Sequence, residues 1–384
     1  MEECRQCQTR KMENTNMSKV FIRKAEYDYK TLKPVFFEIM DRMAENMIQK
    51  NSRVVIKPNL LAPASPEKAI VTHPLIIKAA VEYVLDKGAR PVISDSPAIG
   101  SFEKIIKESG IRDALEGLNV EYAEFRTSLS VDVGKPFNEI EIAADAVNAD
   151  FLINLPKLKT HAQMLLTLGV KNLFGCIVGM KKPEWHFRTG VDRDMFARLL
   201  VKIYQAVNPD ITIMDGILAM QGEGPGKSGE PRHVGVLLGS RDTFAVDIAV
   251  CKMLGISPDR VLTSKYIMEQ GIAAEEFIVD GDLPEVKDFK FPEMAPLVFG
   301  PRQVHNFMRK HLVQRPVCDE SLCKLCGECW KYCPAKAITH EKKKIRFNYE
   351  KCIRCYCCIE VCPHGALSAH ETVLGKTARR ILKM

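Results

Sequence analysis

The sequence predicts an α/β fold, with a largely parallel sheet flanked by helices, followed by a small α+β domain rich in cysteine. Between residues 18 and 300, short apolar runs alternate with stretches of helical periodicity, as in sheets whose two faces are covered by helices. Ten of the fourteen cysteines follow residue 317, and this change in composition marks a domain boundary. The length of 384 residues is sufficient for two or three domains.

The elements of the α/β region are predicted from the spacing of apolar residues along the chain. The helix from Pro74 to Lys87 has apolar residues at helical spacing, and Gly88 stands at the C′ position that favours glycine. Residues 53–57 are a short run containing Val and Ile, which favour strands. The other expected strands are 91–94, 151–155, 211–214 and 234–238, and the other expected helices are 102–109, 195–207 and 243–254.

Composition also sets the boundaries of the regions. Five prolines between residues 284 and 317 indicate a linker, with a basic helical stretch at 304–313. The segment before Met17 is an extension, in which Cys4 and Cys7 form a C-x-x-C without a second pair to complete four metal ligands. The expected divisions are the extension at 1–17, the α/β domain at 18–300, the linker at 301–317, the cysteine-rich domain at 318–371 and a basic tail at 372–384.

The sequence favours a cytoplasmic protein. Its N-terminal residues lack the apolar segment of a secretory signal, and no apolar run approaches the ~20 residues of a membrane span. In such a chain, clustered thiols more often bind metal than form disulfides.

The cysteines occur twice in one pattern, C-x-x-C-x-x-C-x-x-x-C-P. Three cysteines at these intervals reach three corners of one iron–sulfur cubane, and the fourth, before a proline that turns the chain, reaches the other cluster. This is the run of bacterial two-cluster ferredoxins, so we expect two [4Fe–4S] clusters in a small α+β ferredoxin-like domain. Zinc is the alternative, but its sites use two separated C-x-x-C pairs. The expected ligands are Cys323, Cys326, Cys329 and Cys362 for cluster one, and Cys333, Cys352, Cys355 and Cys358 for cluster two.

The charge of the chain argues against nucleic acid as a partner. The formal charge is +7, and two clusters of about −2 each would reduce it to about +3. The lysines at 342–344 read as the solvated tip of a hairpin, and the chain has no long basic stripe with interleaved aromatic residues. Cys318 and Cys357 fall outside the repeated pattern and are expected to be spare thiols.

Polar residues follow four of the predicted strands. Ligands of open α/β sheets bind beyond the carboxyl ends of the strands, so polar residues at four such ends predict a pocket. Lysine is the most frequent among them, and several cations beside one crevice favour an anion such as a carboxylate or phosphate. The strand-end residues are Lys57 and Asn59, then Asp95, then Lys157, Lys159 and His161, and then Asp215; Lys171 and Asn172 follow the third strand.

Roles can be assigned to these residues as hypotheses. We expect Lys157, Lys159 and Lys171 to hold the anion, and His161 to donate a proton because the pKa of histidine lies near working pH. The catalytic candidates are His161, Lys157, Lys159 and Asp215, and the substrate-binding candidates are Lys57, Asn59, Asp95, Lys171 and Asn172.

Two neighbouring groups have simpler interpretations. His161 and His186 are alternatively metal ligands, although hydrogen-bonded or acid–base histidines are more common. Lys181 and Lys182 are interpreted as ordinary solvated lysines.

The glycine-rich loop at 222–229 is not a P-loop. The first glycine of G-x-x-x-x-G-K-S would be residue 221, which is Gln221, and a strand follows where a phosphate-binding helix is required. We interpret the loop as a flexible lid beside Asp215, with a plain surface loop as the alternative.

Together these motifs resemble a known family. The stretches that carry the resemblance are 55–59, 95–97, 156–161, 169–175, Gly224–Pro225 and 245–247. Over roughly residues 20 to 270 they are similar to the domain of unknown function 362 family, and Pro156-Lys157-Leu158-Lys159-Thr160-His161 is the most specific of them. The resemblance implies an iron–sulfur protein, because many members carry a C-terminal ferredoxin-type module, but it implies no particular reaction.

Three functions remain open from the sequence. The first is a ferredoxin-linked oxidoreductase that passes single electrons to or from an anionic substrate or cofactor in the α/β pocket. The second is a non-catalytic electron carrier, or a partner subunit that docks a redox partner protein. In the third, the clusters are structural or sense oxygen. No G-x-G-x-x-G follows the first strand, so the sequence has no nicotinamide or flavin fingerprint.

Overall fold

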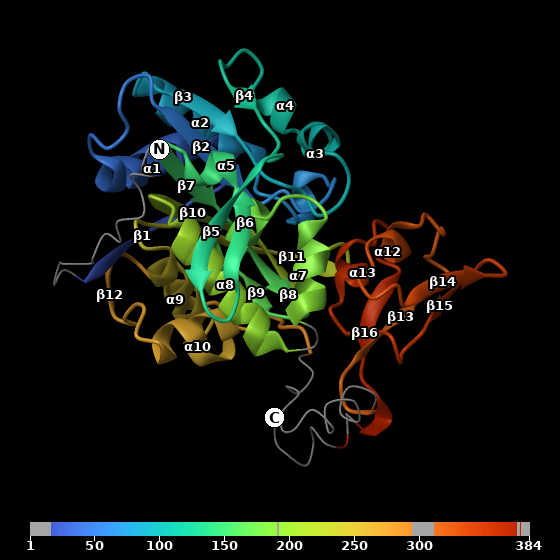
Figure 1. Ribbon diagram of the computed structural model, residues 1–384. Helices are drawn as coiled ribbons and strands as arrows, with labels where there is room; N and C mark the ends of the chain where they lie inside the picture. Colours follow the sequence, from blue (N-terminus) through green and yellow to red (C-terminus); the bar gives the residue numbers. More distant parts are fainter. Residues whose placement is uncertain (1–16, 190–191, 294–310, 375–376, 378–384) are drawn as a thin grey trace.

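The computed structural model describes residues 17–189, 192–293, 311–374 and 377. A large α/β domain carries a small C-terminal domain against the side on which α7 (Lys181–Thr189) and β8 (Lys157–His161) lie (Figure 1). Cys4, Cys7 and most of the expected linker lie outside the described residues.

The large domain is built on a ten-stranded sheet. Its main path has the order β12-β1-β11-β10-β7-β2-β3-β4, and five of the seven neighbouring pairs are parallel. Both antiparallel pairs involve β11, which returns beside β10 as a hairpin, so the prediction of a largely parallel sheet is confirmed. The strands are β1 (Ser18–Lys24), β2 (Arg53–Pro58), β3 (Arg90–Ile93), β4 (Glu121–Tyr122), β7 (Phe151–Leu155), β10 (Ile211–Gly222), β11 (Gly229–Ser240) and β12 (Phe277–Gly281).

Helices cover both faces of this sheet. Alternate side chains of a strand point to opposite faces, and in β2 Val54 and Ile56 pack with α1 and α2 while Val55 packs with α8. The apolar positions of each strand are therefore buried on both sides. The longer helices are α1 (Tyr29–Ala44), α2 (Pro74–Asp86), α3 (Phe102–Glu108), α7 (Lys181–Thr189), α8 (Arg193–Val207), α9 (Thr243–Met253) and α10 (Leu262–Glu269).

Short elements complete the large domain. The short helices are α4 (Ile111–Ala114), α5 (Ala144–Val147) and α6 (Gly169–Asn172), and β5 (Ser128–Gly134) forms a separate hairpin with β6 (Asn138–Ala143). All nine predicted strands and helices occur, and Gly88 has the positive φ of +70° that its C′ position requires. β10 and β11 extend well beyond the predicted 211–214 and 234–238, because they continue as a hairpin past the sheet edge.

One predicted strand end is itself a strand. Residues Lys157–His161 form β8, which pairs with β10 and with β9 (Leu165–Thr167). All five residues of β8 are buried despite their polar composition. The segment therefore lies inside the fold, where the sequence analysis placed a polar turn.

The small domain consists of two similar halves. β13 pairs with β16, and β14 pairs with β15 as a hairpin. The tip of this hairpin, Lys342 and Lys343, has positive φ. The elements are β13 (Arg315–Cys318), α12 (Glu328–Lys331), β14 (Ile338–Glu341), β15 (Lys344–Phe347), α13 (Cys357–Glu360) and β16 (Leu367–His370). Residues 315–317, assigned to the linker from the sequence, thus belong to β13.

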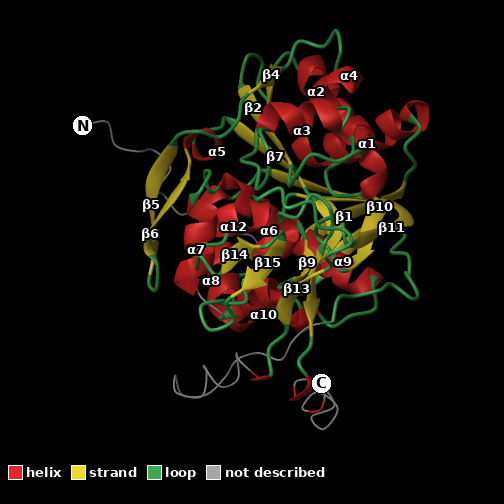
Figure 2. Ribbon diagram, turned by 90° about the vertical axis from the view of Figure 1, so that its right-hand side faces the viewer, coloured by secondary structure: helices red, strands yellow, loops and turns green. Residues whose placement is uncertain are grey.

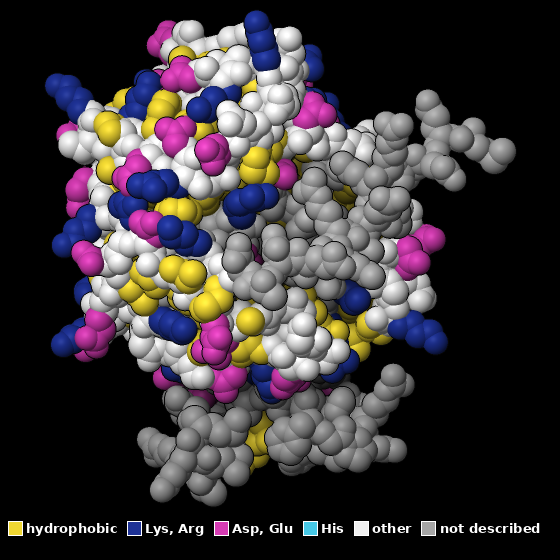
Figure 3. Space-filling view, turned by 90° about the vertical axis from the view of Figure 1, so that its left-hand side faces the viewer, with side chains coloured by type: hydrophobic (Ala, Val, Ile, Leu, Met, Phe, Trp, Pro, Cys, Tyr) yellow, Lys and Arg dark blue, Asp and Glu magenta, His cyan; other side chains and the backbone are white. Residues whose placement is uncertain are grey.

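Viewed from the side of the small domain, α12 and the β14–β15 hairpin lie in front of α6 and β9 (Figure 2). On the opposite side of the molecule, lysines and arginines are interspersed with acidic side chains (Figure 3). No helix within the described ranges is long and apolar enough to cross a membrane.

Candidate functional site

The cysteines of the small domain surround two separate hollows. The first has an empty volume of about 300 Å³ and the second about 320 Å³. Each is lined by three cysteines from one repeat and the fourth from the other. The first is lined by Cys323, Cys326, Cys329 and Cys362, and the second by Cys333, Cys352, Cys355 and Cys358.

These donor sets fit iron–sulfur cubanes. Four thiols around each hollow are the ligand set of a [4Fe–4S] cluster. Backbone N–H groups also reach the fourth cysteine of each repeat: Ala337 donates to Cys333 Sγ (3.2 Å) and Ala366 to Cys362 Sγ (3.3 Å). Such bonds stabilise the negative charge of sulfur.

The loops of the two repeats share one backbone conformation. Leu325 and Arg354 occupy equivalent positions between the first and second cysteines, and both have positive φ. One residue after the second cysteine, Gly327 in the first repeat corresponds to Tyr356 in the second, again with positive φ in both. A non-glycine residue in this conformation is strained and requires support. Tyr356 has such support, since its hydroxyl donates to the carbonyl of Gln314 (2.8 Å).

A third cavity, with an empty volume of about 770 Å³, lies between the two domains. The large domain contributes residues that follow β2 and β3, together with β8, β9, α6 and α7, and the small domain contributes α13 and Tyr332. Six of the nine α/β candidates from the sequence line this cavity: Asn59, Asp95, Lys159, His161, Lys171 and Asn172.

Lys157 and Asp215 lie outside this cavity and form an ion pair (2.9 Å) with both side chains fully buried. Tyr27 completes the group, because its hydroxyl donates to Asp215 Oδ1 (2.6 Å) and accepts from Lys157 Nζ (2.8 Å). The backbone N–H of His73 also donates to Asp215 (3.0 Å), and its ring stacks on Tyr27. Burial lowers the pKa of Lys157, while Asp215 acts in the opposite direction. The structure therefore places both residues in a closed polar network away from the cavity.

Lys57 is likewise buried, and it pairs with Asp95 (3.1 Å). Asp95 also accepts hydrogen bonds from the backbone N–H groups of Leu60 and Ser96. A Cβ at Gly175 would lie 2.2 Å from Asp95 Oδ1 and 2.6 Å from Lys57 Nζ, so the pair requires glycine there. Of the two charged groups, only Asp95 reaches the cavity wall.

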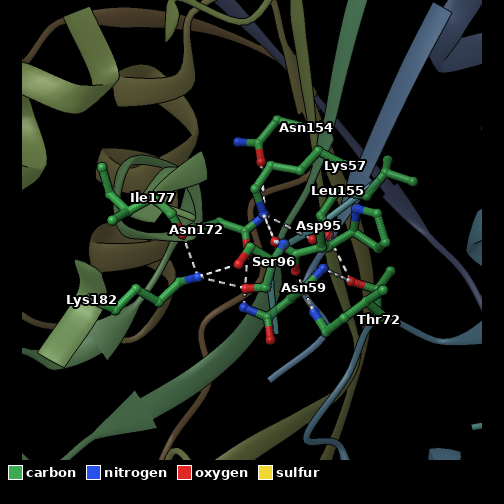
Figure 4. Close-up of polar contacts among 12 residues, drawn as sticks. Lys57, Asn59, Thr72, Asp95, Ser96, Asn154, Leu155, Asn172, Ile177 and Lys182 are labelled. Atoms are coloured by element: carbon green, nitrogen blue, oxygen red, sulfur yellow. Dashed lines mark hydrogen bonds and ion pairs between the residues drawn. The ribbon is translucent and has the colours of Figure 1, made fainter. Parts of the chain in front are cut away.

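Amide side chains connect the strand ends beneath the cavity (Figure 4). Asn59 accepts from Lys159 Nζ (2.8 Å) and donates to Asn172 (2.8 Å), which in turn donates to Asn154 (2.8 Å). Lys159 also donates to the carbonyl of Ile70. Because every member has a partner, this chain of bonds fixes the ammonium of Lys159 at the cavity wall.

His161 is held as a neutral imidazole. Its Nδ1 accepts from the backbone N–H groups of Gln163 (3.1 Å) and Met164 (3.3 Å), which places the proton on Nε2. Burial, followed by the charge of Lys171, lowers the pKa of His161 to about 4. The expectation that this pKa lies near working pH is therefore corrected, although Nε2–H still points into the cavity region as a donor.

The small domain contributes a carboxylate that the sequence analysis missed. Glu360 Oε1 lies 3.0 Å from His161 Nε2. Burial by itself would raise the pKa of Glu360, but His161 and Lys171 outweigh it and lower that pKa. Cys357, expected to be a spare thiol, lines the same cavity.

Two buried polar atoms at the cavity wall lack a hydrogen bond. Among the described residues that line the cavity, they are Thr167 Oγ1 of β9 and His186 Nδ1 of α7, whereas His161 Nε2 and Glu360 Oε1 face each other at 3.0 Å. Buried polar groups nearly always have partners, so two such atoms around one cavity indicate a polar ligand or ordered water there. Of these two residues, the sequence analysis had singled out His186 alone.

Lys182 also differs from expectation. It is buried, and its ammonium donates to the backbone carbonyls of Ser96 and Ile177 and to Ser96 Oγ. Burial lowers its pKa to about 8. Its neighbour Lys181 lies at the surface, where it pairs with Glu141.

The loop at 222–229 packs between the two domains. Gly224 donates to Thr160 Oγ1 (3.2 Å) and its carbonyl accepts from Ala162 (3.0 Å). Pro225 lines the cavity, and Gly226 lies close to the carbonyl of Glu360. The loop thus covers one side of the cavity rather than Asp215.

Positive charge exceeds negative charge at the cavity. Among the described residues that line it, the cations are Lys159, Lys171 and Lys182, and the carboxylates are Asp95, which is paired, and Glu360. Within that part of the chain, the Nζ of Lys171 has no hydrogen bond or ion pair. Burial lowers the pKa of each of these lysines, and a bound anion would offset this cost.

Two families match the chain. Residues 54–252 match the family described as Domain of unknown function (DUF362), and residues 315–363 match the 4Fe-4S dicluster domain. A thylakoid-associated protein of Synechocystis sp. is 36% identical over 276 residues, which cover 70% of this chain and 86% of that protein.

The small domain has relatives of its own. Pyruvate synthase subunit PorD of Thermotoga maritima is 41% identical over 56 residues, which are 14% of this chain and 57% of that subunit. A ferredoxin of Pyrobaculum islandicum is 39% identical over 56 residues, which cover 14% of this chain and 52% of the ferredoxin. Among solved structures, the lactate racemase apoprotein of Thermoanaerobacterium thermosaccharolyticum aligns with a TM-score of 0.38 and 14% identity, over 62% of this chain and 56% of that one. Likeness at that level carries no argument about activity.

Proposed function

Because the chain belongs to the DUF362 family and ends in a ferredoxin-type 4Fe–4S domain, we propose that it is an iron–sulfur oxidoreductase acting on an anionic small molecule in the interdomain cavity. It would hold two [4Fe–4S] clusters. The first four cysteines, Cys323, Cys326, Cys329 and Cys362, would bind cluster one, and Cys333, Cys352, Cys355 and Cys358 would bind cluster two. When bound, such a cluster supplies one-electron redox chemistry.

One observation carries this proposal. Helix α13 is only four residues long, yet it belongs to both sites. Cys358 lines the second cysteine hollow, while Cys357 and Glu360 of the same helix line the interdomain cavity. A ligand in the cavity would therefore lie one helix away from the second set of cysteines.

The residues of the large domain would bind and orient the ligand. The ammonium groups of Lys171 and Lys159 would hold its negative charge. Thr167 Oγ1 would donate a hydrogen bond to it, and the Nε2–H of His161 would hold the Glu360 carboxylate at the cavity wall.

Apolar residues would exclude water from the ligand. Phe174, Pro225, Tyr332 and Val361 line the cavity beside the polar groups. In a site with little water, interactions between the lysines and an anion are stronger than in bulk solvent. The ligand would accordingly combine an anionic end with an apolar body.

A second candidate is a non-catalytic electron carrier or redox subunit. The similarity of the small domain to a ferredoxin and to PorD subunits favours it. In that case the large domain would dock a redox partner protein, and the cavity would hold no molecule that is converted.

The clusters are tested first. Protein purified without oxygen should contain about eight iron atoms per chain and show EPR signals after dithionite reduction. Cys358→Ala should lose about half of the iron, whereas the neighbouring Cys357→Ala should keep all of it. Colourless protein, zinc in place of iron, or equal losses in both variants would contradict the assignment.

The cavity is tested separately. Small organic acids should raise the thermal midpoint of the intact protein, and Lys171→Gln should remove that effect while iron content stays the same. Lys181→Gln, a neighbouring surface lysine, is the matched control and should keep it. If no acid binds or turns over while the clusters exchange electrons normally, the carrier function is favoured instead.

A further inference from the structure

The two cysteine hollows differ in their access to solvent. Cys326 of the first set is exposed, and among the described cysteines it is the only one in that class. In the second set, Cys355 and Cys358 are buried, and Cys333 and Cys352 are only partly accessible. A protein partner would therefore approach the first hollow more closely than the second. This difference matters because electron transfer weakens steeply with distance.

The second hollow also lies nearer the interdomain cavity than the first. The second is adjacent to α13, which forms a wall of the interdomain cavity. The first is lined by Lys324, Leu325 and His364, of which Lys324 and His364 are exposed. The small domain thus has an inner side that faces the ligand cavity and an outer side that faces solvent.

The outer side has the composition of a protein-binding surface. Leu322 is 46% exposed beside Cys323, and the half-buried Leu325 lies next to Cys326. The exposed Lys324 stands between them and, within the described part of the chain, has no ion pair. An apolar centre with a charged rim is typical of interfaces, and redox complexes use small ones.

Charge on this side favours an acidic partner. Residues 319–344 contain six lysines and four acidic residues, whereas residues 345–371 contain three basic and three acidic residues. Two of the four acids are already paired with lysines of the same half: Glu320 with Lys344 (2.6 Å) and Glu328 with Lys331 (3.5 Å). The excess of basic over acidic residues is therefore confined to residues 319–344, the half of the domain that contains the exposed Cys326.

We infer that the face formed by Leu322, Lys324, Leu325 and Cys326 docks an acidic one-electron carrier protein. The first set of cysteines would hold the cluster that receives electrons from this partner, and the second set would hold the cluster nearer the interdomain cavity, beside α13. The inference rests on the proposed presence of the clusters, and it holds whether or not the cavity ligand is converted.

The test compares two charge reversals in the intact, cluster-loaded protein. Lys324→Glu changes the proposed docking face, and Lys351→Glu makes the same change beside Cys352 of the second repeat. With reduced flavodoxin, an acidic one-electron donor, at low salt, the second-order rate of cluster reduction should fall about tenfold in Lys324→Glu. It should stay within about twofold in Lys351→Glu.

The controls separate the docking face from the clusters. Dithionite should reduce both variants as fast as the unchanged protein, and iron content should not change. High salt should remove the difference between the variants, because surface charges are then screened. Equal effects of the two substitutions, or no effect of Lys324→Glu, would overturn the inference. Loss of iron would instead count against the proposed cluster binding.

Discussion

The buried ion pair of Lys157 and Asp215 predicts how the free energy of unfolding changes when either charge is removed. Both side chains are fully buried, with the ammonium and carboxylate 2.9 Å apart. At an effective dielectric constant of about 20, two unit charges at this distance attract by about 6 kcal/mol. Replacing Asp215 with asparagine would leave the ammonium buried without a counter-charge, and a change of this kind costs roughly 3–5 kcal/mol.

The converse substitution should cost less. In Lys157→Met the carboxylate of Asp215 keeps two donors, the hydroxyl of Tyr27 and the backbone N–H of His73. We therefore expect a loss of about 2 kcal/mol. The double variant Lys157→Met/Asp215→Leu removes both charges, so its loss should be smaller than the sum of the single losses by at least about 2 kcal/mol.

The assay is thermal or urea unfolding under anaerobic conditions, followed by circular dichroism. A loss of 3–5 kcal/mol should lower the midpoint by roughly 5–9 °C. Lys104→Met, which breaks an exposed pair with Glu108, is the control and should change stability by less than about 0.5 kcal/mol. If the single variants are as stable as the unchanged protein but inactive, the pair is catalytic rather than structural, and the reasoning is refuted.

Two further predictions concern the cavity wall. Gly175→Ala should destabilise the fold by about 3 kcal/mol in urea unfolding, since the new Cβ would lie 2.2 Å from a carboxylate oxygen of Asp95. Gly179→Ala, which meets open space at a φ of +53°, should cost only about 1 kcal/mol, and similar losses in the two would contradict the steric argument. Burial lowers the pKa of His186 from 6.5 to about 4, so the stability that this group contributes is present above pH 6.5 and is lost as the pH falls toward 4, by about 3 kcal/mol. His186→Phe should lose less stability than the unchanged protein in that pH window, and parallel losses would show that another group titrates.

The sequence predicted the elements whose signals are local. The cysteine spacing led to the two sets of four, and each set lines a hollow of its own. Strands such as 151–155 were recognisable because they are apolar on both faces. β8 was not recognisable as a strand, because Lys157, Lys159 and His161 are polar residues whose buried partners lie far away along the chain.

The composition of the cavity was only half predictable. Side chains at the ends of parallel strands converge by topology alone, which brought Asn59, Asp95 and Lys159 together. Glu360 and Cys357 reach the same cavity from about two hundred residues further along the chain. Contact between two domains leaves no periodic pattern in either of them, so the sequence carried no signal for it.

The antiparallel pairing of β13 with β16 brings the two ends of the small domain side by side, with Arg315 opposite His370. A module that begins and ends at one place can be exchanged for a related module without rerouting the rest of the polypeptide. Any replacement would still have to supply the acidic residue at position 360, which contacts the large domain through His161. Compatibility between electron-carrying modules and this scaffold should therefore depend on one short helix more than on the joining strands.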